Sequence, residues 1–158
     1  MSIHGGDVYR NHVDIDFSIN VNPFGTPECV KEALHKAVEM CGKYPDMEAE
    51  RLGEAVSTFL GVPKEYLIFG NGASELFMAI VHGIKPGKVV IPVPSFYGYE
   101  YAAKSVDSEI IYYEMNQENN FCLKENMKRI LTEEVNLLFL ANPNNPIGNL
   151  LDKELMKE

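Results

Sequence analysis

Long apolar runs, basic clusters and paired cysteines are all missing from this chain of 158 residues. Its strongest apolar run, Val135–Ala141, is far shorter than the roughly 20 residues that span a bilayer. The opening residues show no basic segment followed by an apolar run, which a secretory signal would have. The 14 basic residues form no cluster and are outnumbered by 23 acidic ones. We therefore expect neither a membrane nor a nucleic acid as a partner.

The cysteines and histidines exclude two further classes of site. Cys29, Cys41 and Cys122 are odd in number and widely spaced, so they form no disulfide framework and no CxxC site. None of the four histidines has the spacing of metal ligands. We expect no metal and a reducing, cytoplasmic setting. The nucleophile elbow GxSxG, the zinc motif HExxH and the EF-hand loop are also absent.

Hydrophobic periodicity predicts an α/β fold. Thr26 is a candidate N-cap, and Pro27 opens a helix that runs to about Cys41, with a second helix over 47–60. Strands and helices then alternate, which favours a mainly parallel sheet flanked by helices. The expected strands are 66–69, 89–92, 109–113 and 135–141, and the expected later helices are 74–83, 99–104, 123–131 and one beginning at Asp152.

Three loops follow predicted strands, where α/β sheets bind their ligands. Gly70–Glu75 precedes a helix, so small residues and free N–H groups could hold a phosphate, although an ordinary tight turn fits as well. Val93–Tyr99 gathers three aromatic residues, which could stack on a flat ligand or fill the core. Asn142–Gly148 is stiffened by two prolines and could aim an asparagine amide at a ligand, or bond its own backbone as a turn.

These loops, in this order, resemble the class I/II pyridoxal-phosphate (PLP) aminotransferases of fold type I. Asn142–Gly148 reads NPNNPIG and is similar to the family signature NPNNPTG, with Ile147 in place of threonine. Two branches are most similar: histidinol-phosphate aminotransferases and threonine-phosphate decarboxylases. The segments His4–Asp7 and Asp16–Gly25 look more like the decarboxylase branch. The resemblance covers essentially the whole chain and less than half of such an enzyme.

The resemblance implies a cofactor, pyridoxal 5′-phosphate, and a role for eight residues. Backbone amides of Gly72 and Ala73, with the Ser74 hydroxyl, would hold the cofactor phosphate. Phe96 would stack on the pyridine ring and Asn145 would bond the ring 3-oxygen. The others are Tyr44, which would reach the cofactor of a neighbouring subunit and so implies a homodimer, Asn22 near the substrate, and His4 at a substrate phosphate in the decarboxylase branch.

Each of the last three residues has a structural alternative. Tyr44 could be an exposed loop tyrosine, Asn22 a turn residue and His4 a flexible terminal histidine. The resemblance also implies two parts: residues 1–42, an arm and helix belonging to the small domain or dimer contact, and residues 43–158, the first part of the large PLP-binding domain.

The lysine that forms the Schiff base with PLP lies beyond the NPNNPTG loop in this family. Lys153 and Lys157 sit on a polar, charged segment, where a surface role is expected. We therefore expect the chain alone to be inactive. For the complete enzyme the main hypothesis is amino transfer between an amino acid, phosphorylated in a histidinol-phosphate-like case, and a 2-oxo acid. Decarboxylation of threonine phosphate is an alternative, and a fragment that only binds phosphate or a partner chain is another.

Overall fold

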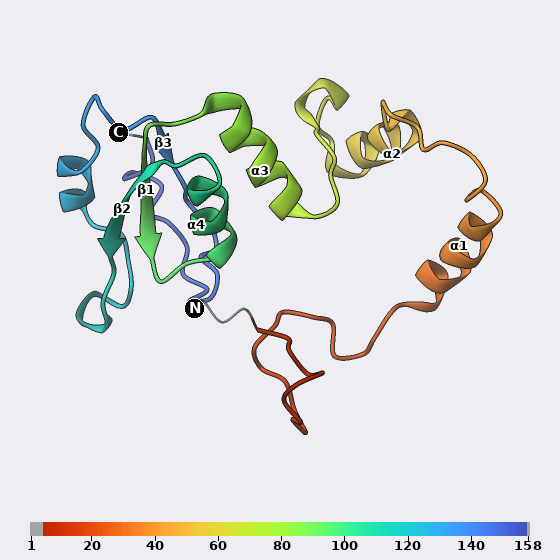
Figure 1. The fold of residues 1–158 in the computed structure, drawn as a ribbon. Helices are drawn as coiled ribbons and strands as arrows, with labels where there is room; N and C mark the ends of the chain where they lie inside the picture. The colour runs from red at the N-terminus through yellow and green to blue at the C-terminus, as the bar shows by residue number, and fades with distance from the viewer. Residues whose placement is uncertain (1–4, 158) are drawn as a thin grey trace. The chain divides into compact units, whose positions relative to one another are not determined.

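The computed structural model describes residues 5–157, which fall into two compact units divided between Ile68 and Phe69 (Figure 1). The first unit contains helix α1 (Glu28–Val38), helix α2 (Glu50–Leu60) and the 3₁₀ helix η1 (Lys64–Tyr66). None of the helices in residues 5–157 has the length and apolar character of a membrane span.

Both helices of the first unit are shorter than predicted. Helix α1 begins one residue after Pro27, which occupies its N-cap position, and ends at Val38. Helix α2 begins only at Glu50, because the Asp46 carboxylate accepts hydrogen bonds from the backbone N–H groups of Glu48 (3.1 Å) and Glu50 (2.8 Å). These bonds hold the preceding residues in a turn that competes with the helix.

The second unit is built on a parallel three-stranded sheet, which confirms the predicted architecture. Strand β1 (Lys88–Val93) lies between β2 (Glu109–Glu114) and β3 (Leu137–Leu138). Its register pairs Lys88 with Glu109 and Val89 with Leu137, parallel in both cases. Helix α3 (Ala73–Ile84) packs against helix α4 (Tyr97–Lys104), and α4 packs on β1 and β2.

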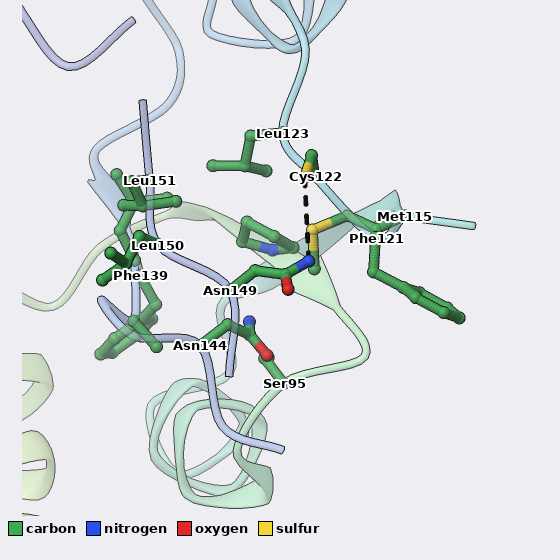
Figure 2. A pocket seen from close by; sticks show the side chains of 13 residues that line it. Ser95, Met115, Phe121, Cys122, Leu123, Phe139, Asn144, Asn149, Leu150 and Leu151 are labelled. Atoms are coloured by element: carbon green, nitrogen blue, oxygen red, sulfur yellow. Dashed lines mark hydrogen bonds between the residues drawn. The ribbon is translucent and has the colours of Figure 1, made fainter. Parts of the chain in front are cut away.

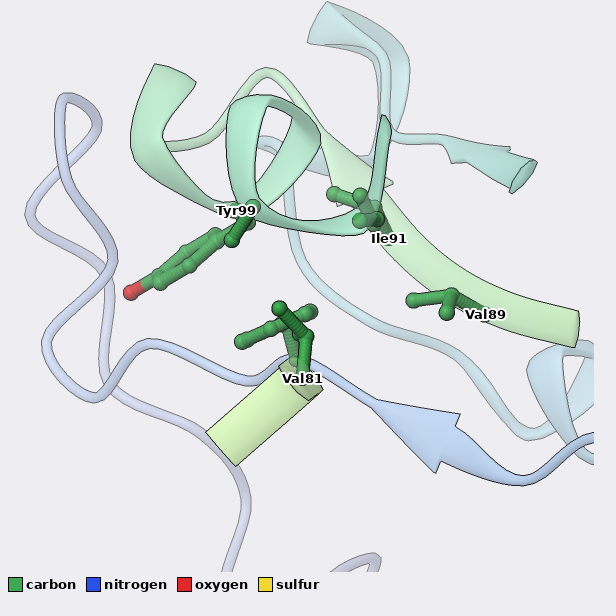
Figure 3. Packing of buried hydrophobic residues seen from close by; sticks show 7 residues of the cluster. Val81, Val89, Ile91 and Tyr99 are labelled. Atoms are coloured by element: carbon green, nitrogen blue, oxygen red, sulfur yellow. The ribbon is translucent and has the colours of Figure 1, made fainter. Parts of the chain in front are cut away.

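Strand β1 is buried on both faces of the sheet, as is usual for the central strand of a parallel sheet. Val89 and Ile91 meet α3 and α4 on one face, where Val81 and Tyr99 complete the contact (Figure 3). The 3₁₀ helices η2 (Gln117–Asn119) and η3 (Glu125–Arg129) follow β2, and η3 with its flanking residues covers the other face. The cluster on that face contains Tyr113, Met115 and Met127.

Four further predicted elements differ from the structure. Residues 66–69 form no strand, because Tyr66 ends η1 and no described strand pairs with 67–69. Residues 123–131 contain only η3, and residues 153–157 form turns in place of a helix. The predicted strand 135–141 is reduced to β3, although the amides of Asn136 and Phe139 still donate to the β1 carbonyls of Lys88 and Val90 (2.9 and 3.1 Å).

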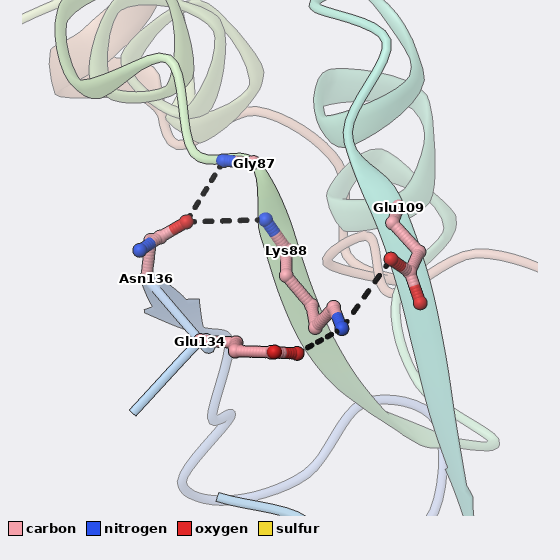
Figure 4. A network of polar contacts seen from close by, with 5 residues as sticks. All are labelled: Gly87, Lys88, Glu109, Glu134 and Asn136. Carbon is pink, nitrogen blue, oxygen red and sulfur yellow. Dashed lines mark hydrogen bonds and ion pairs between the residues drawn. The ribbon is translucent and has the colours of Figure 1, made fainter. Parts of the chain in front are cut away.

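A polar network joins the three strands at the amino end of the sheet (Figure 4). The Lys88 ammonium lies 2.7 Å from a Glu134 carboxylate oxygen and 3.4 Å from one of Glu109. The Asn136 side-chain oxygen accepts hydrogen bonds from the N–H groups of Gly87 (2.9 Å) and Lys88 (3.2 Å). The network therefore ties β2 and the segment before β3 to the central strand.

We expect Lys88→Met to lower the midpoint of thermal unfolding by a few degrees near neutral pH. The hydrogen bond with Lys88 lowers the pKa of Glu134 from 4.5, and that with Glu134 raises the pKa of Lys88 from 10.5. The stability that Glu134 contributes is fully present above pH 4.5, and it is lost as the pH falls through the lower pKa of this group in the folded protein. The stability that Lys88 contributes is present below pH 10.5, and it is lost as the pH rises through the higher pKa of this group in the folded protein.

Thermal melts across this pH range check the prediction. The difference between wild type and Lys88→Met should shrink at both extremes, whereas Lys43→Met, which replaces an exposed lysine of the first unit, should change little at any pH. If the difference in unfolding midpoint stayed constant as the pH fell below 4.5, the Lys88–Glu134 pair would not have the proposed role.

Candidate functional site

The loop before α3 leaves open space at the helix start. Gly72 occupies the N-cap position with φ of +78°, a conformation that glycine adopts readily, and its N–H donates to the Gly70 carbonyl (2.8 Å). A Cβ built on Gly72 would meet no atom within 4 Å, and both Ala73 and Ser74 are exposed. The first N–H groups of a helix have no partner inside it, so this end can accept an anion.

The Glu75 side chain stabilises the same loop by a hydrogen bond. Its carboxylate accepts a short hydrogen bond from the Asn71 backbone N–H, four residues earlier. A carboxylate in the first helical turn also interacts favourably with the positive end of the helix. The side chain that replaces the third glycine of a GxGxxG pattern is therefore part of the loop's own support.

Phe96 lies in the loop between β1 and α4 and is half-buried. Its ring centroid is 6.3 Å from that of Phe77 on α3 and 5.7 Å from that of Tyr99 on α4. A Cβ built on Gly98 would lie 2.4 Å from a Phe96 ring carbon, so the ring can adopt this position only beside a glycine. The Phe96 ring helps to fill the core, and its exposed part remains able to stack on a flat ligand.

Four aromatic rings connect the three loops, and we call Phe77, Phe96, Tyr99 and Phe139 the aromatic cluster. Phe77 contacts Tyr99 (5.0 Å) and Phe139 (5.9 Å) edge to face, and Tyr99 stacks on Phe139 at 4.8 Å. Burial raises the pKa of Tyr99. Phe77 follows the first loop, Phe96 lies in the second and Phe139 precedes the third. Packing of these rings therefore sets the loops relative to one another.

In the third loop, asparagines 142 and 144 bond the backbone. The Asn142 side-chain oxygen accepts from the Leu151 N–H (3.0 Å), and that of Asn144 accepts from the Ile147 N–H (3.3 Å). The Asn144 carbonyl also accepts from the Gly148 N–H (2.6 Å). The turn interpretation thus describes these two residues, whereas Asn145 is exposed.

A small cavity of about 20 Å³ lies behind the second and third loops, enough for roughly one water molecule (Figure 2). Ser95, Asn144 and Asn149 supply polar groups to its wall. The Asn149 amide donates to the Asn120 carbonyl and to the Cys122 sulfur (3.7 Å). Neither Ser95 nor Asn149 was predicted as a site residue. In the sequence, only their places next to Phe96 and to the loop 142–148 point to them.

The predicted site residues of the second unit follow elements that pack together. Phe96 and Asn145 come after the adjacent parallel strands β1 and β3, and Gly72, Ala73 and Ser74 start the helix that packs on α4. Two other predicted residues belong to the first unit: Tyr44, whose side chain is fully exposed, and Asn22, whose amide bonds the N–H of Phe24 and the carbonyl of Gly25 (3.0 Å each). His4 lies outside the described residues.

Residues 13–158 match the family model of the class I and II aminotransferases, and the chain belongs to this family. It is 40% identical over 154 residues to a provisionally named threonine-phosphate decarboxylase from Caldanaerobacter subterraneus, covering 96% of this chain and 41% of that protein. It is 32% identical to the histidinol-phosphate aminotransferase of Methanococcus aeolicus, covering 89% and 39%.

Solved structures give the same fold. The histidinol-phosphate aminotransferase of Clostridium acetobutylicum superimposes with a TM-score of 0.73 at 28% identity, over 88% of this chain and 40% of that one. The chain thus spans less than half the length of the relatives it matches. These findings confirm the predicted family and fold.

The predicted cofactor, pyridoxal 5′-phosphate, is the cofactor of this family. A histidinol-phosphate aminotransferase from Sinorhizobium meliloti has been solved in complex with it, with a TM-score of 0.70 at 23% identity over 78% of this chain and 34% of that one. The residues present here fit such a group. The open space at Gly72 can accept a phosphate, and the half-exposed Phe96 ring can contact a planar ring.

Proposed function

We propose that the complete enzyme is a threonine-phosphate decarboxylase that uses PLP. The observation that carries this proposal is the 40% identity over 154 residues to a provisionally named threonine-phosphate decarboxylase, compared with 36% over 139 residues to the histidinol-phosphate aminotransferase of Chlorobium luteolum. The opening segments His4–Asp7 and Asp16–Gly25, which look like this branch, support the same choice.

In this proposal the second unit holds the cofactor. The amides of Gly72 and Ala73 and the hydroxyl of Ser74 bind its phosphate at the positive end of α3. Phe96 lies against the ring, and Asn145 donates its amide to the ring 3-oxygen. When bound, PLP accepts the electron pair of a bond broken at the substrate α-carbon. The chain's own residues orient the ring, and the packing of the aromatic cluster fixes the positions of their loops relative to one another.

The remaining roles concern the first unit and the assembly. We propose that Tyr44 reaches the cofactor phosphate of a neighbouring subunit in a homodimer, that Asn22 lies near the substrate, and that His4 binds the substrate phosphate. Residues 1–42 would then belong to the small domain and the dimer contact, and residues 43–158 to the large domain. The Schiff-base lysine would come from beyond the matched region, and the enzyme would act in cytoplasmic amino-acid metabolism.

Amino transfer is the second candidate. The family itself and the 28% identity to a solved histidinol-phosphate aminotransferase favour it. In this case the amino donor would become a carbonyl compound, a ketone where the donor is histidinol phosphate, the nitrogen would pass to a 2-oxo acid, and no carbon dioxide would leave. The two reactions require the same cofactor contacts, so the residues of the second unit do not separate them.

The deciding experiment measures carbon dioxide released from O-phospho-L-threonine by the complete enzyme with PLP, beside amino transfer from histidinol phosphate to 2-oxoglutarate. We expect carbon dioxide release and little transfer. Transfer without carbon dioxide would replace the proposal by the second candidate. Residues 1–158 alone serve as a control for the fragment hypothesis, in which phosphate binding would persist without either reaction.

A further inference from the structure

Two tyrosines of residues 69–157 are buried, and their hydroxyls differ in what they contact. Tyr113 is 6% exposed, and its hydroxyl donates a hydrogen bond to the Asn126 side-chain oxygen at 2.7 Å. Tyr99 is 9% exposed, but its hydroxyl bonds none of residues 5–157. A buried tyrosine hydroxyl usually has a hydrogen-bond partner. The Tyr99 hydroxyl is therefore available to a group from outside these residues.

The Tyr99 hydroxyl points toward the end of the sheet at which the candidate site lies (Figure 3). Val89 precedes Ile91 along β1, and the Tyr99 oxygen lies beyond Ile91, on the side away from Val89. This direction is that of the carboxyl ends of the parallel strands, beyond which α/β sheets bind their ligands. The hydroxyl thus faces the end of the sheet from which the second and third loops leave.

Three aromatic rings fix the Tyr99 side chain in this direction. It stacks on Phe139 with 4.8 Å between centroids and 16° between planes, and it meets Phe77 edge to face at 5.0 Å. The third ring is that of Phe96, at 5.7 Å, whose exposed part can contact a planar ligand. A hydroxyl that packing holds in one direction beside such a residue is preorganised for binding.

Burial keeps this hydroxyl a hydrogen-bond donor. It raises the pKa of Tyr99 above the ordinary value of 10.0, because a buried phenolate is less well solvated than the neutral phenol. The side chain is therefore uncharged near neutral pH, with its proton in place. A neutral O–H donates readily to an anionic oxygen, and PLP carries such oxygens on its phosphate and at ring position 3.

We infer that Tyr99 is a further cofactor-binding residue, whose hydroxyl donates a hydrogen bond to an oxygen of bound PLP. The inference rests on the proposed function, in which the second unit holds PLP with Phe96 against its ring. A buried hydroxyl without a partner destabilises the protein, and a bond to PLP offsets this cost on binding. Tyr99 then stabilises the complex more than it stabilises the cofactor-free protein.

Tyr99→Phe in the complete enzyme tests the inference, because it removes only the hydroxyl and keeps the ring that packs on Phe139. The probe is pyridoxamine 5′-phosphate, which forms no Schiff base, so equilibrium dialysis reports only its non-covalent contacts. We expect its Kd to rise about three- to tenfold, on the scale of one hydrogen bond. The midpoint of thermal unfolding without cofactor should stay the same or rise, because the variant lacks a buried hydroxyl that has no partner.

Two tyrosines of the same unit give matched controls. Tyr113→Phe removes a buried hydroxyl that has a partner, so it should lower the midpoint by about 2–4 °C and leave Kd within about twofold. Tyr101→Phe removes a hydroxyl from the same helix as Tyr99, but this side chain is 57% exposed, so neither quantity should change.

Two results for Tyr99→Phe would each overturn the inference. One is a Kd equal to that of wild type. The other is a midpoint that falls as far as that of Tyr113→Phe, because the hydroxyl would then support the cofactor-free protein itself.

Failure of the proposed function gives different results. If the complete enzyme transfers amino groups and releases no carbon dioxide, the proposed reaction is wrong but the inference stands, since both reactions use the same cofactor contacts. If Ser74→Asp, which places a carboxylate at the start of α3, binds the probe as tightly as wild type, the second unit does not hold the phosphate there. The proposed cofactor site then fails, and the inference fails with it.

Discussion

Replacing Ser74 by aspartate is expected to weaken binding of the cofactor at least about 100-fold, because it sets a carboxylate against the phosphate. The same change should leave the chain as stable as wild type, or more stable by about 0.3–1 kcal/mol, since an acidic side chain in the first turn of α3 interacts favourably with the helix dipole. Few substitutions at a binding site have opposite effects on stability and binding.

Equilibrium dialysis of the complete enzyme against PLP, together with thermal melts without PLP, checks both halves of this prediction. Ser74→Asn is the matched control, because it is close in size to aspartate and carries no charge. It should weaken binding far less. If Ser74→Asp bound PLP as tightly as Ser74→Asn, the phosphate would not lie at the start of α3.

Replacing Phe139 by alanine is expected to lower the free energy of unfolding by about 3–5 kcal/mol, the range for a buried phenylalanine. Phe139 is 8% exposed, and it contacts Tyr99 and Phe77 within the aromatic cluster. Its removal leaves a cavity between α3, α4 and the segment after β3. Denaturant unfolding followed by circular dichroism measures the change.

Phe59→Ala is the matched control for size and chemistry, because Phe59 on α2 is 87% exposed. It should change the free energy of unfolding by less than about 0.5 kcal/mol. The Phe139 variant should also speed hydrogen exchange in 142–148, since that loop follows the lost ring. Equal effects of the two substitutions would show that the aromatic cluster is not the main contact of this core.

Much of the second unit could be predicted because its signals are local. The apolar run of β1 and the glycine-rich start of α3 each indicate their element within a few residues. Residues 66–69 look like a strand by composition, but a strand forms only with a hydrogen-bonded neighbour, and sequence pattern does not supply one. Strand β3 was overestimated for a related reason, since only its middle pairs fully with β1.

The candidate site shows the same division. Glycine at 72 and the two prolines around Asn145 mark their loops in the sequence, although the same residue types also suit ordinary turns. Phe77 and Phe139 do not, since a phenylalanine in a helix or strand looks like any core residue. Their importance comes from distances between segments far apart in the chain. The contrast between the hydroxyls of Tyr99 and Tyr113 is likewise invisible without coordinates.

The strand order β2-β1-β3 has a consequence for how the second unit is made. The central strand is the first of the three in the sequence, so a ribosome releases it before either neighbour. Each later strand then meets an edge that already exists. Closing the shorter loop costs less entropy, so β2 should join first and β3 last. Damage to β1 would disrupt both pairings at once, whereas damage to β3 would leave the β1–β2 pair able to assemble.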